Sequence, residues 1–186
     1  MTRRLIGFGA FYACWFACID GAARGLPWLG PLAVVVYVAV YLLTIPSVAA
    51  RSRQAWLLAL AGGAGYAADS VLVLSGVLRF PAQAVLGWPS TIWMVALWVL
   101  QAAVLGGAMS WLRDRFVLAA ALGAVGGPLA YLAGERLGAA VLGPTRTAAV
   151  AAIAALWTVA MPVMVWMDRW ARAGAESRTA DERFAQ

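Results

Sequence analysis

The chain has 186 residues, of which 64% are hydrophobic and only 12% charged, and its mean hydropathy is +0.82, well outside the usage of soluble globular proteins. Its formal net charge of +6 comes entirely from 14 arginines set against 8 acidic residues, but these arginines flank apolar runs and form no basic stripe for nucleic acid. The chain has no histidine and no lysine, which excludes imidazole metal or haem ligands, histidine-activated nucleophiles and lysine Schiff bases.

The apolar runs predict an all-α fold, a polytopic transmembrane bundle of six helices, because several approach the ~20 residues that cross a bilayer. Residues 1–167 form the predicted transmembrane domain, and residues 168–186 form a charged cytoplasmic tail, expected as a frayed helix or disorder. The predicted helices, in chain order, are Leu5–Ile19, Leu29–Ala50, Ala55–Leu78, Thr91–Trp111, Phe116–Gly134 and Thr147–Met167. Arg51–Gln54 is expected to be a short basic loop, and Arg79–Ser90 the longest polar connection.

The first run follows two arginines and ends near small residues, so it resembles a signal peptide. We interpret it as a signal-anchor helix that stays in the protein. Cys14 and Cys18 share one face of this helix, but two thiols without further soft ligands are more typical of buried hydrophobic positions than of a metal or redox site.

The distribution of arginines predicts the topology. One set of alternate connections carries Arg3, Arg4, Arg51, Arg53, Arg113, Arg115, Arg169, Arg172, Arg178 and Arg183, and the other carries only Arg24, Arg79, Arg136 and Arg146. By the positive-inside rule, both termini are cytoplasmic in a bacterial inner membrane. Tryptophans support these boundaries, because Trp56, Trp111, Trp166 and Trp170 fall at the inner helix ends and Trp28, Trp88 and Trp93 at the outer ones.

Asp69 is the most informative polar residue, because it lies about fourteen residues into the third predicted helix, roughly 21 Å from its start. An ionisable group in the hydrocarbon costs about 3 kcal/mol or more, so it is expected to be uncharged, paired or facing water. We predict interhelical partners, namely an arginine or a hydroxyl from helix one, four or five, with Arg136 the preferred charge partner.

Depth along the other helices predicts a polar cluster in the outer half of the membrane, which is a candidate ligand site. Its members are Asp69, Gln101, Tyr131, Glu135, Arg136, Asp20 and Tyr66. The alternative is that these groups only satisfy one another and hold the helices together. Pro128, which follows Gly126 and Gly127, indicates a kink bordering a cavity.

The segments Gly65–Pro81, Trp93–Trp111 and Leu122–Gly138, followed by Leu156-Trp157 and Pro162, resemble an uncharacterised bacterial family of small polytopic inner-membrane proteins, a domain-of-unknown-function class. The resemblance covers nearly the whole chain except the tail. Members are often encoded near cyclopropane-fatty-acid-synthase-like genes, which implies a role in membrane-lipid modification or handling. The resemblance assigns no catalytic residue.

The leading hypothesis is therefore a non-catalytic lipid-handling or scaffold protein with membrane lipids as partners, in which Arg136 meets a lipid phosphate and Asp69 and Tyr131 orient it. The alternatives are an accessory subunit of a larger membrane complex and a proton-coupled small-solute transporter in which Asp69 titrates. An enzyme remains conceivable only through carboxylate and tyrosine acid-base chemistry. No metal, cofactor or nucleic acid is expected.

Overall fold

The computed structural model describes the backbone of residues 2–184 and the side chains of residues 5–171. Its elements are α1 (Thr2–Ala23), α2 (Leu29–Leu43), α3 (Val48–Leu74), β1 (Leu78–Arg79), η1 (Ala82–Ala84), α4 (Ile92–Gly106), η2 (Ser110–Leu112), α5 (Phe116–Arg136), β2 (Val141–Leu142) and α6 (Arg146–Phe184). The predicted all-α bundle is confirmed, and the chain is a membrane protein: the segments Leu5–Ala23, Val48–Leu74, Phe116–Arg136 and Arg146–Ala171 are long and apolar enough to cross a bilayer.

The boundary between the second and third helices differs from the predicted one. α2 ends at Leu43, not at residue 50, because Pro46 cannot continue the helix and disfavours helical geometry in the preceding residue. α3 begins at Val48 with a hydrogen bond from the Ala50 backbone N–H to the Ser47 side chain, so the expected basic loop forms its first turns. At 15 residues α2 is too short to span the hydrocarbon on its own.

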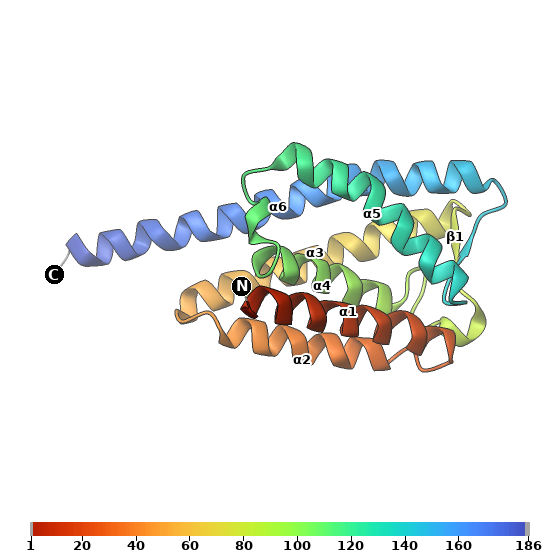
Figure 1. The fold of residues 1–186 in the computed structure, drawn as a ribbon, viewed down its shortest axis with the longest axis horizontal. Helices are drawn as coiled ribbons and strands as arrows, with labels where there is room; N and C mark the ends of the chain where they lie inside the picture. The colour runs from red at the N-terminus through yellow and green to blue at the C-terminus, as the bar shows by residue number, and fades with distance from the viewer. Residues whose placement is uncertain (1, 185–186) are drawn as a thin grey trace.

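α4 is likewise a 15-residue helix that ends at Gly106, short of the predicted boundary. Gly107 and the 3₁₀ turn η2 replace its expected last turn. α6 instead runs past residue 168 to Phe184, so the predicted tail begins inside a continuous helix, which Figure 1 shows projecting beyond the bundle.

Two connections meet at one end of the bundle, which we call the strand end. β1, in the predicted polar connection, pairs antiparallel with β2, which joins α5 to α6 (Figure 1). The Glu135 carboxylate accepts the Leu142 backbone N–H at 3.1 Å and pairs with Arg146 at 2.7 Å, so it ties α5, β2 and α6 together. The opposite end, from which α6 extends, is the tail end.

The two tryptophan belts are only partly as expected. Most of the tryptophans assigned to helix ends are exposed, as an interfacial position requires. Trp93 is the exception, since it is 1% exposed and its indole N–H donates to the Ala84 carbonyl at 2.9 Å. It anchors the loop before α4 instead of facing a membrane interface.

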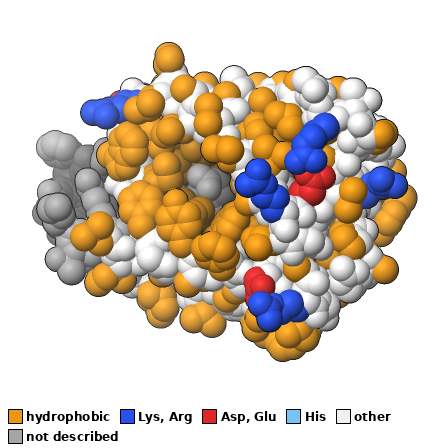
Figure 2. Space-filling view, turned by 45° about the vertical axis from the view of Figure 1, so that its right-hand side comes forward, with side chains coloured by type: hydrophobic (Ala, Val, Ile, Leu, Met, Phe, Trp, Pro, Cys, Tyr) orange, Lys and Arg blue, Asp and Glu red, His pale blue; other side chains and the backbone are white. Residues whose placement is uncertain are grey.

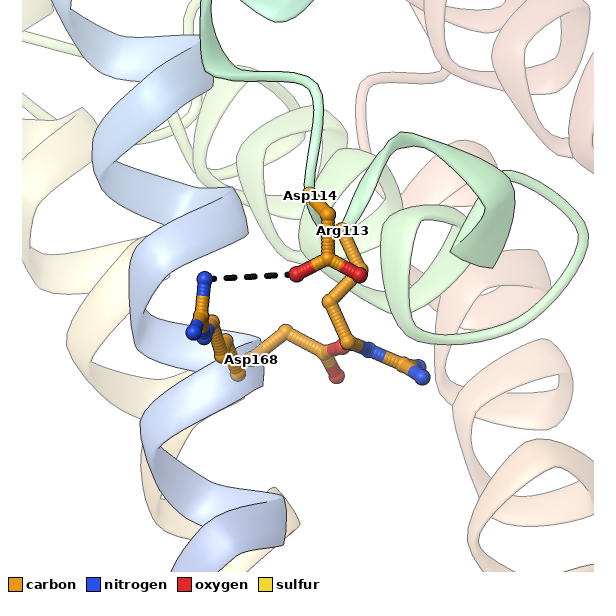
Figure 3. A network of polar contacts seen from close by, with 4 residues as sticks. Arg113, Asp114 and Asp168 are labelled. Atoms are coloured by element: carbon orange, nitrogen blue, oxygen red, sulfur yellow. Dashed lines mark hydrogen bonds and ion pairs between the residues drawn. The ribbon is translucent and has the colours of Figure 1, made fainter.

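A cluster of charged residues lies at the tail end. Asp168 is buried and accepts a hydrogen bond from the Arg113 guanidinium at 3.2 Å, while Arg169 pairs with Asp114 at 3.2 Å (Figure 3). Gly106 lets these groups approach α4, because a Cβ there would lie 2.9 Å from an Asp168 carboxylate oxygen. The cluster joins α6 to the loop between α4 and α5.

α5 and α6 pack closely along their length because α5 presents glycine to α6. A Cβ on Gly123 would overlap the backbone carbonyl of Trp157, whereas a Cβ on Gly126, nearly one turn further, would meet no atom within 4 Å. Small residues at such positions allow helices in lipid to pack backbone to backbone.

The two glycines provide a matched test of this packing. Gly123→Ala is expected to destabilise the protein by at least about 1 kcal/mol, because α6 has to move. Gly126→Ala is expected to be neutral or to stabilise by up to about 1 kcal/mol, since alanine favours a helix. Thermal unfolding in one detergent measures both, and equal melting temperatures for the two variants would contradict the close approach at Gly123.

Candidate functional site

Asp69 lies on α3 roughly one and a half turns from its strand end and has no exposed surface. The Trp98 indole N–H from α4 donates to one carboxylate oxygen at 2.9 Å, and the Tyr131 hydroxyl from α5 donates to the other at 2.5 Å. The prediction of interhelical partners is thus confirmed. The expected pairing with Arg136 is wrong, because neutral donors meet the carboxyl and the Arg136 side chain is exposed.

Two stacked tryptophans surround this carboxyl. The rings of Trp98 on α4 and Trp157 on α6 are 4.6 Å apart between centroids and inclined by 24°. Glycines make the room, since a Cβ on Gly65 would overlap the Trp98 ring and one on Gly127 would overlap the Trp157 ring. The carboxyl, its donors and the stack therefore join α3, α4, α5 and α6.

A cavity of about 490 Å³ lies against this cluster, between α1, α4, α5 and α6. Its size falls within the roughly 300–1,000 Å³ of ligand pockets. Trp98, Tyr131 and Trp157 form part of its wall, and Asp69 lies behind them without lining it. The wall is predominantly apolar and rich in aromatic rings, as ligand pockets for apolar molecules are.

Two helix faces border the cavity opening. α1 contributes a stripe at helical spacing, Phe8, Phe11, Tyr12, Trp15 and Ile19, and α5 contributes Leu122, Gly126, Leu129 and Ala133. α1 packs against α2 and α4, while α5 packs mainly against α6, so the cleft between them stays open. Figure 2 shows this hollow rimmed largely by hydrophobic side chains. The cavity therefore opens between two helices that are both long and apolar enough to cross a bilayer.

Charged groups gather beyond the cavity at the strand end. Asp20 pairs with Arg24 at 2.8 Å, with both side chains largely exposed, and Glu135 pairs with Arg146. Arg136 follows Glu135 directly, is exposed, and forms no ion pair with any side chain in the described range 5–171. It is thus a cation available to a ligand near the cavity.

The structure divides the predicted polar cluster. Tyr131 and Gln101 line the cavity, Asp69 is enclosed behind it, and Asp20, Glu135 and Arg136 lie at the strand end. Tyr66 points elsewhere, since its hydroxyl donates to the Trp88 carbonyl at 2.8 Å and holds the loop before α4. A cavity does lie beside Gly126 and Gly127, next to Pro128, while the kink expected at Pro128 stays a prediction.

Sequence reasoning missed two features of the site. The role of Trp98 as a donor to Asp69 depends on which face of α4 meets α3, which spacing alone does not determine. The aromatic residues of α1 are spaced three or four apart in the sequence, which places them on one helix face. In a helix expected to contact lipid, however, such a face cannot be told apart from an ordinary lipid-facing one. Within the described side chains, no three cysteines or acidic residues are grouped to hold a metal ion.

Comparison with known proteins supports the resemblance seen in the sequence. A family model described as "Protein of unknown function (DUF2878)" matches residues 4–163. No curated protein and no solved structure matches the chain. The match covers α2, α3, α4 and α5 and parts of α1 and α6, and it includes every residue that lines the cavity.

The hydrogen bond between Tyr131 and Asp69 can be measured by a double-mutant cycle. Tyr131→Phe is expected to destabilise the protein by about 1–3 kcal/mol, because it leaves a buried carboxylate oxygen without its donor. In an Asp69→Leu background the same change is expected to cost far less. Tyr12→Phe, at an exposed tyrosine, is the control and is expected to stay within about 0.5 kcal/mol. Additive effects of the Tyr131 and Asp69 changes would reject the bond.

Proposed function

This chain belongs to the DUF2878 family of proteins of unknown function, and from its cavity we propose that it binds a membrane lipid, with one chain between α1 and α5 and the anionic head group at Arg136. The observation that carries the proposal is the apolar, aromatic cavity that opens sideways between two helices. A lipid chain reaches such a cavity from the hydrocarbon without crossing water. The role is non-catalytic handling or scaffolding of lipids in membrane-lipid modification.

The head-group assignment rests on charge and position. Arg136 ends α5 at the strand end, and Ala133 and Gly134, in the preceding turn, line the cavity. An arginine guanidinium offers up to five N–H donors in a planar fork that matches phosphate. Arg24 and Arg146 each hold an acidic partner. Arg79, which like Arg136 is exposed and has no ion pair among the described side chains, lies on β1 outside the cavity lining, whereas Arg136 follows the cavity-lining Gly134 by two residues and is the better candidate for a lipid phosphate.

The placement in the membrane follows from the arginine distribution. With both termini in the cytoplasm of a bacterium, the strand end faces the outer leaflet of the inner membrane. The bound lipid then comes from that leaflet, with its head group at the interface and its chain directed toward the bilayer centre.

Asp69 has a structural part in this proposal, in place of the orienting role first expected of it. Its two oxygens are occupied by Trp98 and Tyr131, which form the cavity wall. A proton-coupled transporter needs a titrating group that solute or water can reach, and the enclosure of Asp69 favours lipid handling over transport.

Arg136→Ala is expected to reduce the anionic lipid that co-purifies with the protein. A basic residue near an anionic lipid surface contributes about 1 kcal/mol, so occupancy at limiting lipid should fall roughly fivefold. Mass spectrometry of the gently solubilised protein measures this. Arg115→Ala, at the other end of α5, is the matched control and should retain its lipid. Unchanged occupancy in Arg136→Ala would sink the head-group assignment.

Gly126→Leu tests the cavity itself. Gly126 lines the cavity and has open space around its missing side chain, so leucine is expected to fill the site without a clash. The variant should lose co-purified lipid while its melting temperature stays level. The control is Gly63→Leu, at a glycine of α3 that also has open space but lies outside the cavity. Full lipid occupancy in Gly126→Leu would place the lipid elsewhere.

A further inference from the structure

Gln101 is a polar side chain in the otherwise apolar part of the cavity. It lies on α4 one turn after Trp98 and faces α6, where its amide nitrogen contacts the Met161 sulfur at 3.4 Å. A thioether is a weak acceptor, whereas a glutamine amide offers two N–H donors and a carbonyl acceptor. Among the described residues, no other side-chain hydrogen bond of Gln101 is present.

The depth of Gln101 makes this arrangement costly. It follows Ile92, the first residue of α4, by nine positions, which places it roughly 14 Å from the strand end of that helix, near the middle of a ~30 Å hydrocarbon core. Water does not satisfy polar groups in that region, so an amide with only a weak sulfur acceptor is unfavourable there. The neighbouring donors of Trp98 and Tyr131 are engaged by Asp69, whereas the buried Trp157 indole N–H, which is also in the cavity wall, has no hydrogen-bond acceptor among the described residues.

The cavity links Gln101 to the strand end. Its lining runs from Gly134, one turn or less from Arg136, to Gln101 and Met161. A lipid chain lying along it with its head group at Arg136 therefore passes the Gln101 amide partway along its length. The amide can distinguish chains by what they carry at that depth.

We propose that the ligand is a lipid whose chain bears an oxygen function, a hydroxyl or a carbonyl, near its middle, and that Gln101 recognises this oxygen by hydrogen bonding. The inference rests on the proposed function, because it requires a chain in the cavity. An oxygen at this depth offers the Gln101 amide a better partner than the weak Met161 sulfur acceptor, whereas an unsubstituted chain places only methylene groups against it.

Binding of three defined fatty acids to the delipidated protein tests the inference. The probes are stearic acid and its mid-chain hydroxy and keto derivatives, and their binding is followed by tryptophan fluorescence, since several tryptophans line the cavity. The wild-type protein is expected to bind one or both oxygenated probes roughly two- to tenfold more tightly than stearic acid, as one neutral hydrogen bond allows. Comparing the two derivatives distinguishes a hydroxyl from a carbonyl.

Gln101→Leu is expected to abolish this preference and to bind stearic acid at least as well as the wild-type protein does. Met161→Leu, which removes only the weak sulfur contact, should keep the preference. Equal affinity of the wild type for all three probes, or a preference retained in Gln101→Leu, would overturn the inference.

The same experiment separates the inference from the proposed function. If all probes bind equally and Gly126→Leu abolishes binding, the lipid cavity stands and only the recognition by Gln101 fails. If no probe binds to the wild-type protein, the proposed function fails together with the inference. Melting temperatures of the variants show that each is folded.

Discussion

The structure depends on the complete burial of the Asp69 carboxyl in a helix that crosses the membrane. A carboxyl in such a position needs donors for both oxygens, because neither lipid nor water supplies them there. Trp98 and Tyr131 provide these donors from two other helices. The Trp98 ring in turn occupies space left by Gly65, and the Trp157 ring stacked on it occupies space left by Gly127. One polar group thereby specifies how four helices approach one another.

The same constraint explains where the cavity lies. α5 is held against α6 and its Tyr131 reaches Asp69, whereas α1 packs against α2 and α4, so α1 and α5 do not pack along each other. The cleft left between α1 and α5 is lined by their facing side chains and floored by α4. Its wall is formed partly by the residues that satisfy Asp69, so the stability of the core and the shape of the cavity depend on shared side chains.

Local physical rules were enough to predict much of the fold, while the site depended on the way helices face one another. Apolar length predicts six helices. It does not predict the end of α2, where Pro46 interrupts an otherwise apolar run, or the pairing of β1 with β2, which joins segments about sixty residues apart. Depth arithmetic correctly marked Asp69 as needing interhelical partners. Arg136 was the expected partner because an opposite charge is the pairing that a sequence indicates most clearly. In the structure, the Trp98 indole N–H and the Tyr131 hydroxyl donate to the carboxyl instead. The rotation of each helix about its axis decides between these partners. It cannot be predicted from a helix that is hydrophobic on all faces.

The most direct test is a density map of the protein in lipid nanodiscs. The proposed site predicts elongated density between α1 and α5 that begins near Arg136, passes Gln101, and leaves Asp69 enclosed by Trp98 and Tyr131. A map in which α1 packs directly against α5, with no space for a chain, would contradict the proposed function.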